Sequence, residues 1–176
     1  MTARNSADGF GWVTRVLHWS IALGVLFLLP LGAYVARMEV GFSNFWLFGL
    51  HKSIGITVFA LLLVRIVWHR VSPPPHPLPS GVAWKDRAAV LVHRSFYVLL
   101  VVVPLSGWIG SGATGLDVLI FERVTLPPLA PTSEAWEAVA FGVHWVATKL
   151  LLACVVLHVA GGLSRRDGTL RRIIVG

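Results

Sequence analysis

Four long apolar stretches constrain the fold of this 176-residue chain more than any other feature of its sequence. Each is close to the about 20 residues that an α-helix needs to cross the hydrocarbon layer of a membrane. A helix satisfies its own backbone hydrogen bonds, which lipid cannot do, so each stretch is expected to be helical. The sequence therefore predicts an all-α integral membrane protein with a bundle of four transmembrane helices, over residues Val16–Val35, Leu50–Trp68, Ala88–Ile109 and Ala138–Leu163.

The composition agrees with this interpretation. Hydrophobic residues make up 56% of the chain and charged residues only 13%, whereas a soluble domain carries about 25% charged residues. Four spans with short connections use nearly all of the chain. Residues 1–176 are therefore expected to form a single transmembrane domain without a separate soluble part.

The basic residues are divided unevenly between the two sides of this topology. Arg37, Lys52 and Arg123 fall on the side of the first and third connections. Eleven others fall on the side of the termini and the second connection: Arg4, Arg15, Arg65, Arg70, Lys85, Arg87, Arg94, Arg165, Arg166, Arg171 and Arg172. Because cytoplasmic loops are enriched in basic residues, both termini are predicted to be cytoplasmic. The net charge of +7 is then explained by the membrane topology and does not indicate a nucleic-acid-binding surface.

The connections and the single cysteine add further constraints. The inner connection contains SPPPHPLPS, which favours an extended polyproline-type spacer. The outer connection, about residues 112–137, is expected to cap the outer face and to end at a helix start in SEAWE, with Ser133 as the N-cap. Cys154 is the only cysteine, which excludes an intrachain disulfide, a cysteine-based zinc site and covalent haem attachment through Cys-x-x-Cys-His.

Four histidines within or at the ends of the spans pair by depth. His144 and His158 lie 14 residues apart, which places them on one helix face and about 21 Å apart along its axis. His51 has the outer depth of His144, and His18 has the inner depth of His158. Two imidazoles that face each other across a bundle suit the axial positions of a haem iron, and the missing attachment motif indicates b-type haem. Zinc fits less well, because each level offers two ligands and not three or four.

The other three histidines have weaker claims to a ligand role. His93, near the inner start of the third span, competes with His18 as the partner of His158, and spacing alone leaves both pairings open. His69 and His76 fall at or beyond the inner end of the second span and are interpreted as interfacial or loop residues.

Two basic side chains and one glycine lie close to these histidines in the sequence. Arg65 follows His51 by 14 residues, so it shares that helix face at the inner depth. It is expected either to bind a haem propionate or to reach the cytoplasmic surface by snorkelling. Lys52 is a candidate contact for an outer propionate or for a substrate. Gly55 admits either a porphyrin plane or close helix packing.

Taken together, four motifs resemble those of the bacterial cytochrome b561 family. They are RVLHW in the first span, LHKSIGI in the second, HRSFYVLLVVVPLSG in the third and the two histidines of the fourth. The resemblance covers nearly the whole chain and implies a four-helix membrane bundle that holds two haems b. It makes His18 and His158 the inner-haem ligands, and His51 and His144 the outer-haem ligands. His93 is then a non-ligand expected near a haem edge or a quinone.

The resemblance also implies a function. An iron with two axial histidines has no open position, so single-electron transfer is expected. The protein would lie in the bacterial cytoplasmic (inner) membrane and exchange electrons between a periplasmic donor or acceptor and the quinone pool. Some such proteins oxidise superoxide and reduce ubiquinone, which would make this chain an oxidoreductase. The outer loops hold five acids against three bases, so they give no general steering of an anion, and superoxide stays a candidate.

Two other classes of function remain open from the sequence. The chain would serve as a haem-bearing membrane anchor if it co-purified with a larger dehydrogenase or hydrogenase complex. It would be a non-redox membrane protein, with histidines that bind a metal or a transported ligand, if it gave no reduced-minus-oxidised haem spectrum.

Overall fold

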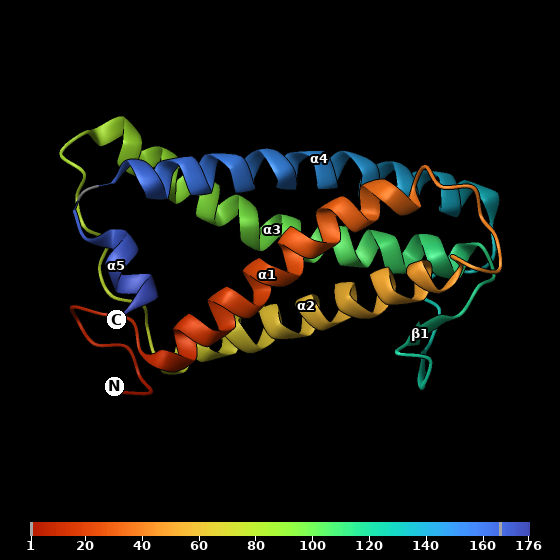
Figure 1. Cartoon of the computed structure of the whole chain (residues 1–176), viewed down its shortest axis with the longest axis horizontal. Helices are drawn as coiled ribbons and strands as arrows, with labels where there is room; N and C mark the ends of the chain where they lie inside the picture. Colours follow the sequence, from red (N-terminus) through yellow and green to blue (C-terminus); the bar gives the residue numbers. More distant parts are fainter. Residues whose placement is uncertain (1, 166) are drawn as a thin grey trace.

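The computed structural model describes residues 2–165 and 167–176, so one of the basic residues counted above, Arg166, lies outside the described residues. Four long helices dominate the architecture (Figure 1): α1 Trp12–Val35, α2 Trp46–Val71, α3 Ala83–Ala113 and α4 Glu134–Ser164. All four are long and apolar enough to cross a membrane. Each helix contains one of the predicted apolar stretches. Helix α1 begins before its stretch and ends with it at Val35, and the other three helices extend beyond theirs at both ends.

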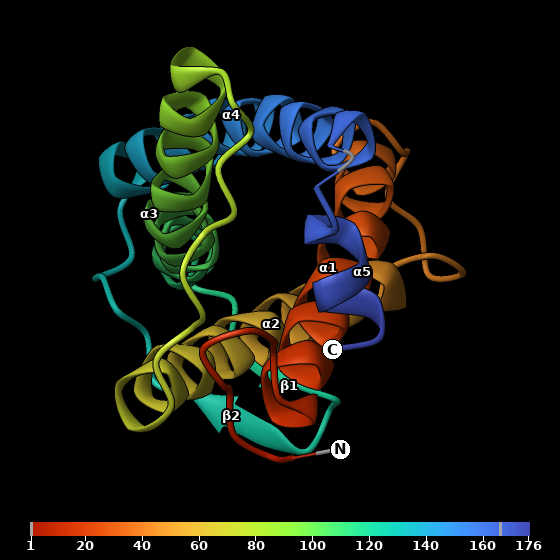
Figure 2. The same ribbon diagram turned by 90° about the vertical axis from the view of Figure 1, so that its left-hand side faces the viewer.

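The helices are arranged as two closely packed pairs. Helix α3 packs most extensively against α4, and α1 packs against α2, whereas α2 and α3 make fewer contacts and α1 and α4 approach each other only sparsely. Figure 2, with the end that holds both termini toward the viewer, shows the four helices around a common axis. We call this end of the bundle the inner end and the opposite end the outer end.

An apolar layer joins the two pairs near the middle of the bundle. All four helices contribute to it, and Leu62 is only 1% exposed. The buried members of the layer are Ile21, Val25, Val58, Leu62, Leu99, Leu100, Ala147 and Leu151. Because the outward surfaces of the helices are expected to face lipid, this narrow layer carries most of the core packing.

A β-hairpin at the outer end corrects the expectation of a purely α-helical chain. Strands β1, Val118–Ile120, and β2, Val124–Leu126, pair antiparallel within the outer connection and lie beside α2 (Figure 1). The turn between them has Phe121 and Glu122 at positive φ, 47° and 59°. Three residues, 121–123, join the paired Ile120 and Val124, and positions with positive φ in hairpin turns normally take Gly, Asn or Asp, so the sequence lacked the usual hairpin signal here. The predicted helix start after this connection is confirmed, because the Ser133 side chain accepts a hydrogen bond from the Trp136 backbone.

Ser53 on α2 fixes the hairpin to the bundle. Its side chain is 1% exposed, and its hydroxyl accepts a hydrogen bond from the Phe121 backbone N–H at 2.8 Å. The same hydroxyl lies 2.7 Å from the Gly49 carbonyl and 3.3 Å from the Leu119 carbonyl, to which it donates. One buried hydroxyl therefore satisfies backbone groups of both elements.

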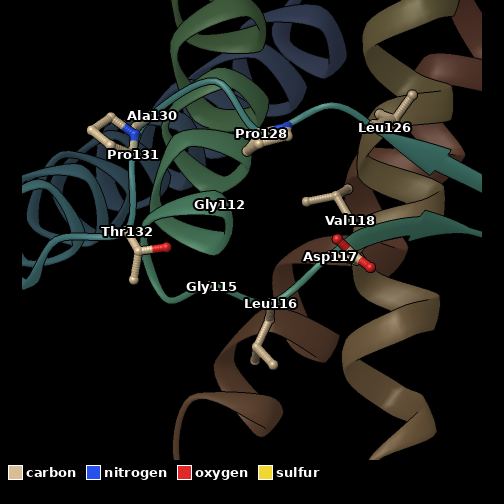
Figure 3. Close-up of a pocket in the computed structure, with 10 residues that line it drawn as sticks. All are labelled: Gly112, Gly115, Leu116, Asp117, Val118, Leu126, Pro128, Ala130, Pro131 and Thr132. Carbon is tan, nitrogen blue, oxygen red and sulfur yellow. The ribbon is translucent and has the colours of Figure 1, made fainter.

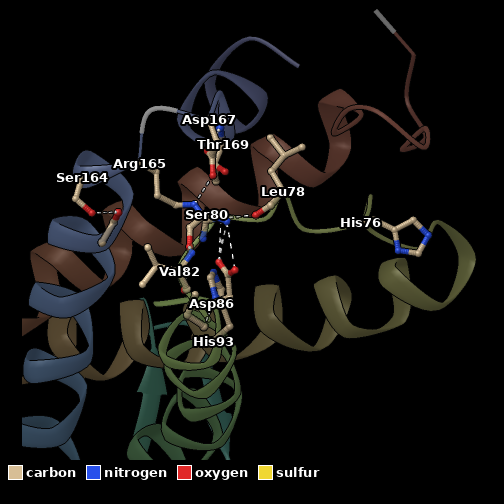
Figure 4. A network of polar contacts seen from close by, with 12 residues as sticks. His76, Leu78, Ser80, Val82, Asp86, His93, Ser164, Arg165, Asp167 and Thr169 are labelled. Carbon is tan, nitrogen blue, oxygen red and sulfur yellow. Dashed lines mark hydrogen bonds and ion pairs between the residues drawn. The ribbon is translucent and has the colours of Figure 1, made fainter. Parts of the chain in front are cut away.

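At the inner end the chain termini and the proline-rich connection interlock. Arg165 forms ion pairs with Asp86 and Asp167 and also donates to the Leu78 carbonyl (Figure 4). Partial burial acts to raise the pKa of Asp167, but hydrogen bonds from Thr169 and Arg165 outweigh it and bring that pKa down to about 2. Asp167 is therefore ionised at neutral pH, and the ion pair with Arg165 persists.

The short helix α5, Thr169–Ile174, folds back against the start of α1. The Trp19 indole donates to the Ile173 carbonyl at 3.1 Å, and Arg15 donates to the Ile174 carbonyl at 3.0 Å. The carboxyl-terminal segment thus lies over the inner end of the bundle, close to His18.

Replacing Ser53 with alanine is expected to loosen the hairpin from α2. The Phe121 N–H, whose hydrogen bond to Ser53 is part-buried, would lose its acceptor, which costs at most about 1–3 kcal/mol, the range for a fully buried donor. Hydrogen exchange of the Phe121 amide should accelerate in Ser53→Ala, whereas Ser43→Ala, at an exposed position before α2, should leave it unchanged. Equal protection in both variants would contradict the role given to Ser53.

Candidate functional site

The structure brings His51 of α2 and His144 of α4 together at the outer end. Their ring centroids are 6.3 Å apart, with the ring planes inclined at 75°. Nδ1 of His144 lies 2.8 Å from the Val103 carbonyl of α3. Since a carbonyl only accepts, Nδ1 carries the proton, and the lone pair on Nε2 of His144 is free to bind a metal. Nδ1 of His51 is buried and has no hydrogen-bond partner among the described residues.

Two helical glycines allow the outer imidazoles to approach neighbouring backbones. A Cβ at Gly107 of α3 would lie 3.1 Å from Cε1 of His144. A Cβ at Gly32 of α1 would lie 3.0 Å from Cε1 of His51. Both distances are tighter than ordinary contacts, so a side chain at either position would displace a histidine ring. The outer histidines are therefore seated against α1 and α3 as well as facing each other.

The inner end repeats the arrangement with His18 of α1 and His158 of α4. Their ring centroids lie 6.2 Å apart, and the planes are inclined at 62°. Phe96 of α3 packs against His158 with a centroid distance of 5.3 Å. The His93 ring also approaches His158, at 5.1 Å, and His93 donates from Nδ1 to the Ala89 carbonyl at 2.6 Å.

The ring separations test whether a metal fits between the histidines. A metal–nitrogen bond of about 2 Å on each side, added to about 1 Å from each nitrogen to its ring centre, requires about 6 Å between centroids. The separations of 6.2 Å and 6.3 Å meet this requirement at both levels. His93 and His158, at 5.1 Å, are too close to bind one metal from opposite sides, as the two axial ligands of a haem iron would. The described residues contain no group of three or more His, Cys, Asp or Glu side chains placed to hold a metal ion.

Each histidine pair also crosses the separation between the two packed helix pairs, α1 with α2 and α3 with α4. Each pair takes one imidazole from α4 and one from α1 or α2, helices that have only sparse backbone contact with α4. A flat group held by its centre between two imidazoles would therefore extend into the region between the two helix pairs. The fold and the histidines together fit haem b at both levels.

The other predicted site residues lie near these levels. Arg65 lies within electrostatic range of His18, His158 and His69. The ammonium of Lys52 lies 3.4 Å from the Asp117 carbonyl, to which it donates, at the outer end. A Cβ at Gly55 would meet no atom within 4 Å, so close helix packing does not occupy this position.

A pocket of about 270 Å³ lies in the outer connection, between the hairpin and the end of α3 (Figure 3). Gly112, Pro128 and Thr132 contribute to its lining, and Asp117 supplies its only ionisable side chain. None of the four paired histidines lines this pocket. The Lys52 ammonium lies beside Asp117, so the pocket has no clear excess of either charge.

Four membrane-length helices with two facing histidine pairs define a membrane-spanning cytochrome of the b type. Comparison with known proteins agrees, because the family model described as prokaryotic cytochrome b561 matches residues 9–176. The chain belongs to this family, which consists of membrane electron-transfer proteins with haem b. It is accordingly a multi-pass protein of the prokaryotic inner membrane.

Two relatives from Escherichia coli (strain K12) are also similar to this chain over most of its length. The chain is 29% identical to cytochrome b561 homolog 2 over 182 residues, which cover 99% of this chain and 95% of that protein. It is 26% identical to cytochrome b561 homolog 1 over 164 residues, which cover 90% and 92%. The similarity therefore extends over the transmembrane helices and their connections.

Sequence reasoning did not identify the residues that support the histidines. Gly32 and Gly107 were not distinguished from other helical glycines, because only the tertiary structure shows which glycine faces a ring. Val103 contributes through its backbone carbonyl, which leaves no signal in a side-chain pattern. A glycine at the depth of a candidate ligand on a neighbouring span is the one signal that was present.

Gly107→Val is expected to impair the outer site, because the added side chain would displace the His144 ring. The haem-to-protein ratio of the purified variant should fall toward half of the original value, with the inner low-spin signal retained. Gly142→Val is a matched control on α4, since a Cβ at Gly142 would meet no atom within 4 Å. Full haem content in Gly107→Val would show that the close approach is not needed.

Proposed function

We propose that this protein holds two haems b and passes electrons between a periplasmic redox partner and the quinone pool. The observation that carries the proposal is the presence of two histidine pairs at metal-bridging separations, 6.2 Å and 6.3 Å, at opposite ends of one bundle. His18 and His158 would hold the inner haem, and His51 and His144 the outer haem. When bound, a bis-histidine haem iron supplies transfer of one electron at a time.

The protein's own residues prepare both levels for this chemistry. The Val103 carbonyl fixes the His144 tautomer, and the ring of Phe96 restrains His158. The apolar layer around Leu62 lies between the levels and keeps water from the middle of the bundle. Arg65 and Lys52 are proposed as cofactor contacts at the inner and outer levels, where a cation would compensate the negative charge of propionates.

The proposed orientation places the termini in the cytoplasm and the hairpin in the periplasm. It rests on the uneven distribution of basic residues between the two sides. Ubiquinone is the proposed membrane substrate, since four membrane-spanning helices would hold both haem levels beside the lipid in which quinone dissolves.

Superoxide is a candidate donor at the outer end, although the charges of the outer loops give no general steering of an anion. The acids Glu39, Asp117, Glu122, Glu134 and Glu137 outnumber the bases on that side, and Asp117 lines the outer pocket. The second candidate function is a haem-bearing membrane anchor of a larger dehydrogenase or hydrogenase complex. The interlocked inner end and the exposed outer hairpin both offer surfaces for such a complex.

The ligand assignment predicts separable losses of the two haems. His51→Ala and His144→Ala should remove the outer low-spin centre first, and His18→Ala and His158→Ala the inner one. His93→Ala should retain both, because the His93 ring is too close to His158 for the two to bind one iron from opposite sides. Pyridine haemochrome stoichiometry and low-temperature electron paramagnetic resonance measure these outcomes. Loss of a low-spin centre in His93→Ala, with both retained in His18→Ala, would reverse the inner assignment.

Electron transfer to quinone is tested with the purified protein in lipid vesicles. After chemical reduction, the haem absorbance should return to the oxidised form when ubiquinone is added, and a superoxide source should support steady quinone reduction if superoxide is the donor. His144→Ala should slow both reactions at least tenfold, whereas His76→Ala, in the inner connection, should not. A protein inactive alone but active with a co-purified soluble subunit would favour the membrane-anchor function.

A further inference from the structure

Arg65 is a cation within a membrane-spanning helix for which the described residues provide no counter-ion. The two ion pairs among these residues both belong to Arg165, which engages Asp86 and Asp167. Arg65 is only partly exposed and lies within electrostatic range of three imidazoles, His18, His158 and His69. Charged groups at membrane depth are paired or reach water, and imidazoles do not neutralise a guanidinium.

A second unsatisfied group lies one helical turn away. His69 follows Arg65 by four residues on α2, so the two side chains occupy the same face. Nδ1 of His69 lies 3.2 Å from the Tyr97 hydroxyl of α3. Nε2 of His69 is buried and has no hydrogen-bond partner among the described residues. When the Tyr97 hydroxyl donates to Nδ1, the imidazole proton is on Nε2, and His69 presents a buried donor without an acceptor.

The Arg65 guanidinium and the His69 N–H would both be satisfied by an acceptor with negative charge. A guanidinium without a carboxylate and a buried N–H without an acceptor, on one face at the depth of the inner histidine pair, form a site for an oxyanion. Among the described residues no acid forms an ion pair with Arg65, and Asp86 and Asp167 are held by Arg165, so a ligand from outside the chain would supply the oxyanion. At this depth, two kinds of molecule offer such a group: a haem propionate and the phosphate of a phospholipid.

We propose that Arg65 and His69 bind a propionate of the inner haem, with Tyr97 as a positioning residue that sets the tautomer of His69. The inference deepens the proposed function and rests on it, since it requires a haem at the inner level. The propionate is favoured over a lipid phosphate because Arg65 is within electrostatic range of both inner histidines, whereas a phosphate remains at the headgroup layer. His69 is thereby assigned a binding role that its position at the end of the span did not indicate.

Redox-difference infrared spectroscopy of the whole protein tests the site directly. Growth on carbon-13-labelled 5-aminolevulinate labels the propionate carboxylates, so that their bands are identified by the isotope shift. Arg65→Gln, His69→Leu and Tyr97→Phe should each shift a labelled band, and His69→Gln, which retains a donor, should restore it in part. The matched controls Arg70→Gln, His76→Leu and Tyr34→Phe should leave the bands unchanged.

Haem retention provides a second measurement that does not depend on activity. Loss of one charge-assisted hydrogen bond should speed transfer of one of the two haems to excess apomyoglobin by about tenfold in Arg65→Gln and His69→Leu. Unchanged propionate bands and unchanged transfer rates in variants that hold two haems would overturn the inference and leave the proposed function intact. Unchanged bands with loss of tightly bound phospholipid in these variants would also overturn it, in favour of a lipid phosphate. An unaltered protein without haem would instead refute the proposed function.

Discussion

The separation between two packed helix pairs is the constraint on which the rest of the structure depends. Helices α1 and α2 form one pair, α3 and α4 form the other, and α4 has only sparse backbone contact with α1 and α2. The facing histidines lie across this separation at two depths, with ring centroids 6.2 Å and 6.3 Å apart. If the pairs packed more tightly, the imidazoles would touch and leave no room for a metal. The spacing between the helix pairs thus decides whether the bundle accommodates a cofactor.

The apolar layer at mid-membrane and the glycines beside the outer histidines maintain this spacing together. The layer sets a minimum distance between the pairs, because side chains such as Leu62 and Leu151 fill the space between them. Gly107 acts in the opposite sense and allows a ring to lie against a backbone without pushing the helices apart. Polar groups near the rings are few and specific, as the Val103 carbonyl on His144 shows. Rigid seating of this kind suits electron transfer, which requires little rearrangement of the surrounding protein.

The two ends of the molecule are built differently. At the outer end a single buried hydroxyl, that of Ser53, joins the hairpin to α2. At the inner end, hydrogen bonds and ion pairs link the termini to the proline-rich connection, and the carboxyl-terminal helix rests on residues next to His18. The inner end is therefore closed by several separate polar contacts, whereas the outer end is covered by the outer connection and its hairpin.

The sequence by itself determined the four apolar helices, the uneven division of the basic residues between the two ends of the bundle and the depth of each histidine along its helix. It did so because lipid leaves the backbone no hydrogen-bonding partner but itself, so that apolar stretches become helices and residue number converts directly into depth. It did not determine which helices pack together, or whether His18 or His93 stands at a metal-bridging distance from His158. Nor did it indicate the hairpin, whose turn residues are atypical, or the unpaired donors around Arg65. Only the tertiary structure decided these features, because the rotation and separation of helices depend on side chains from distant parts of the chain that meet in the folded bundle.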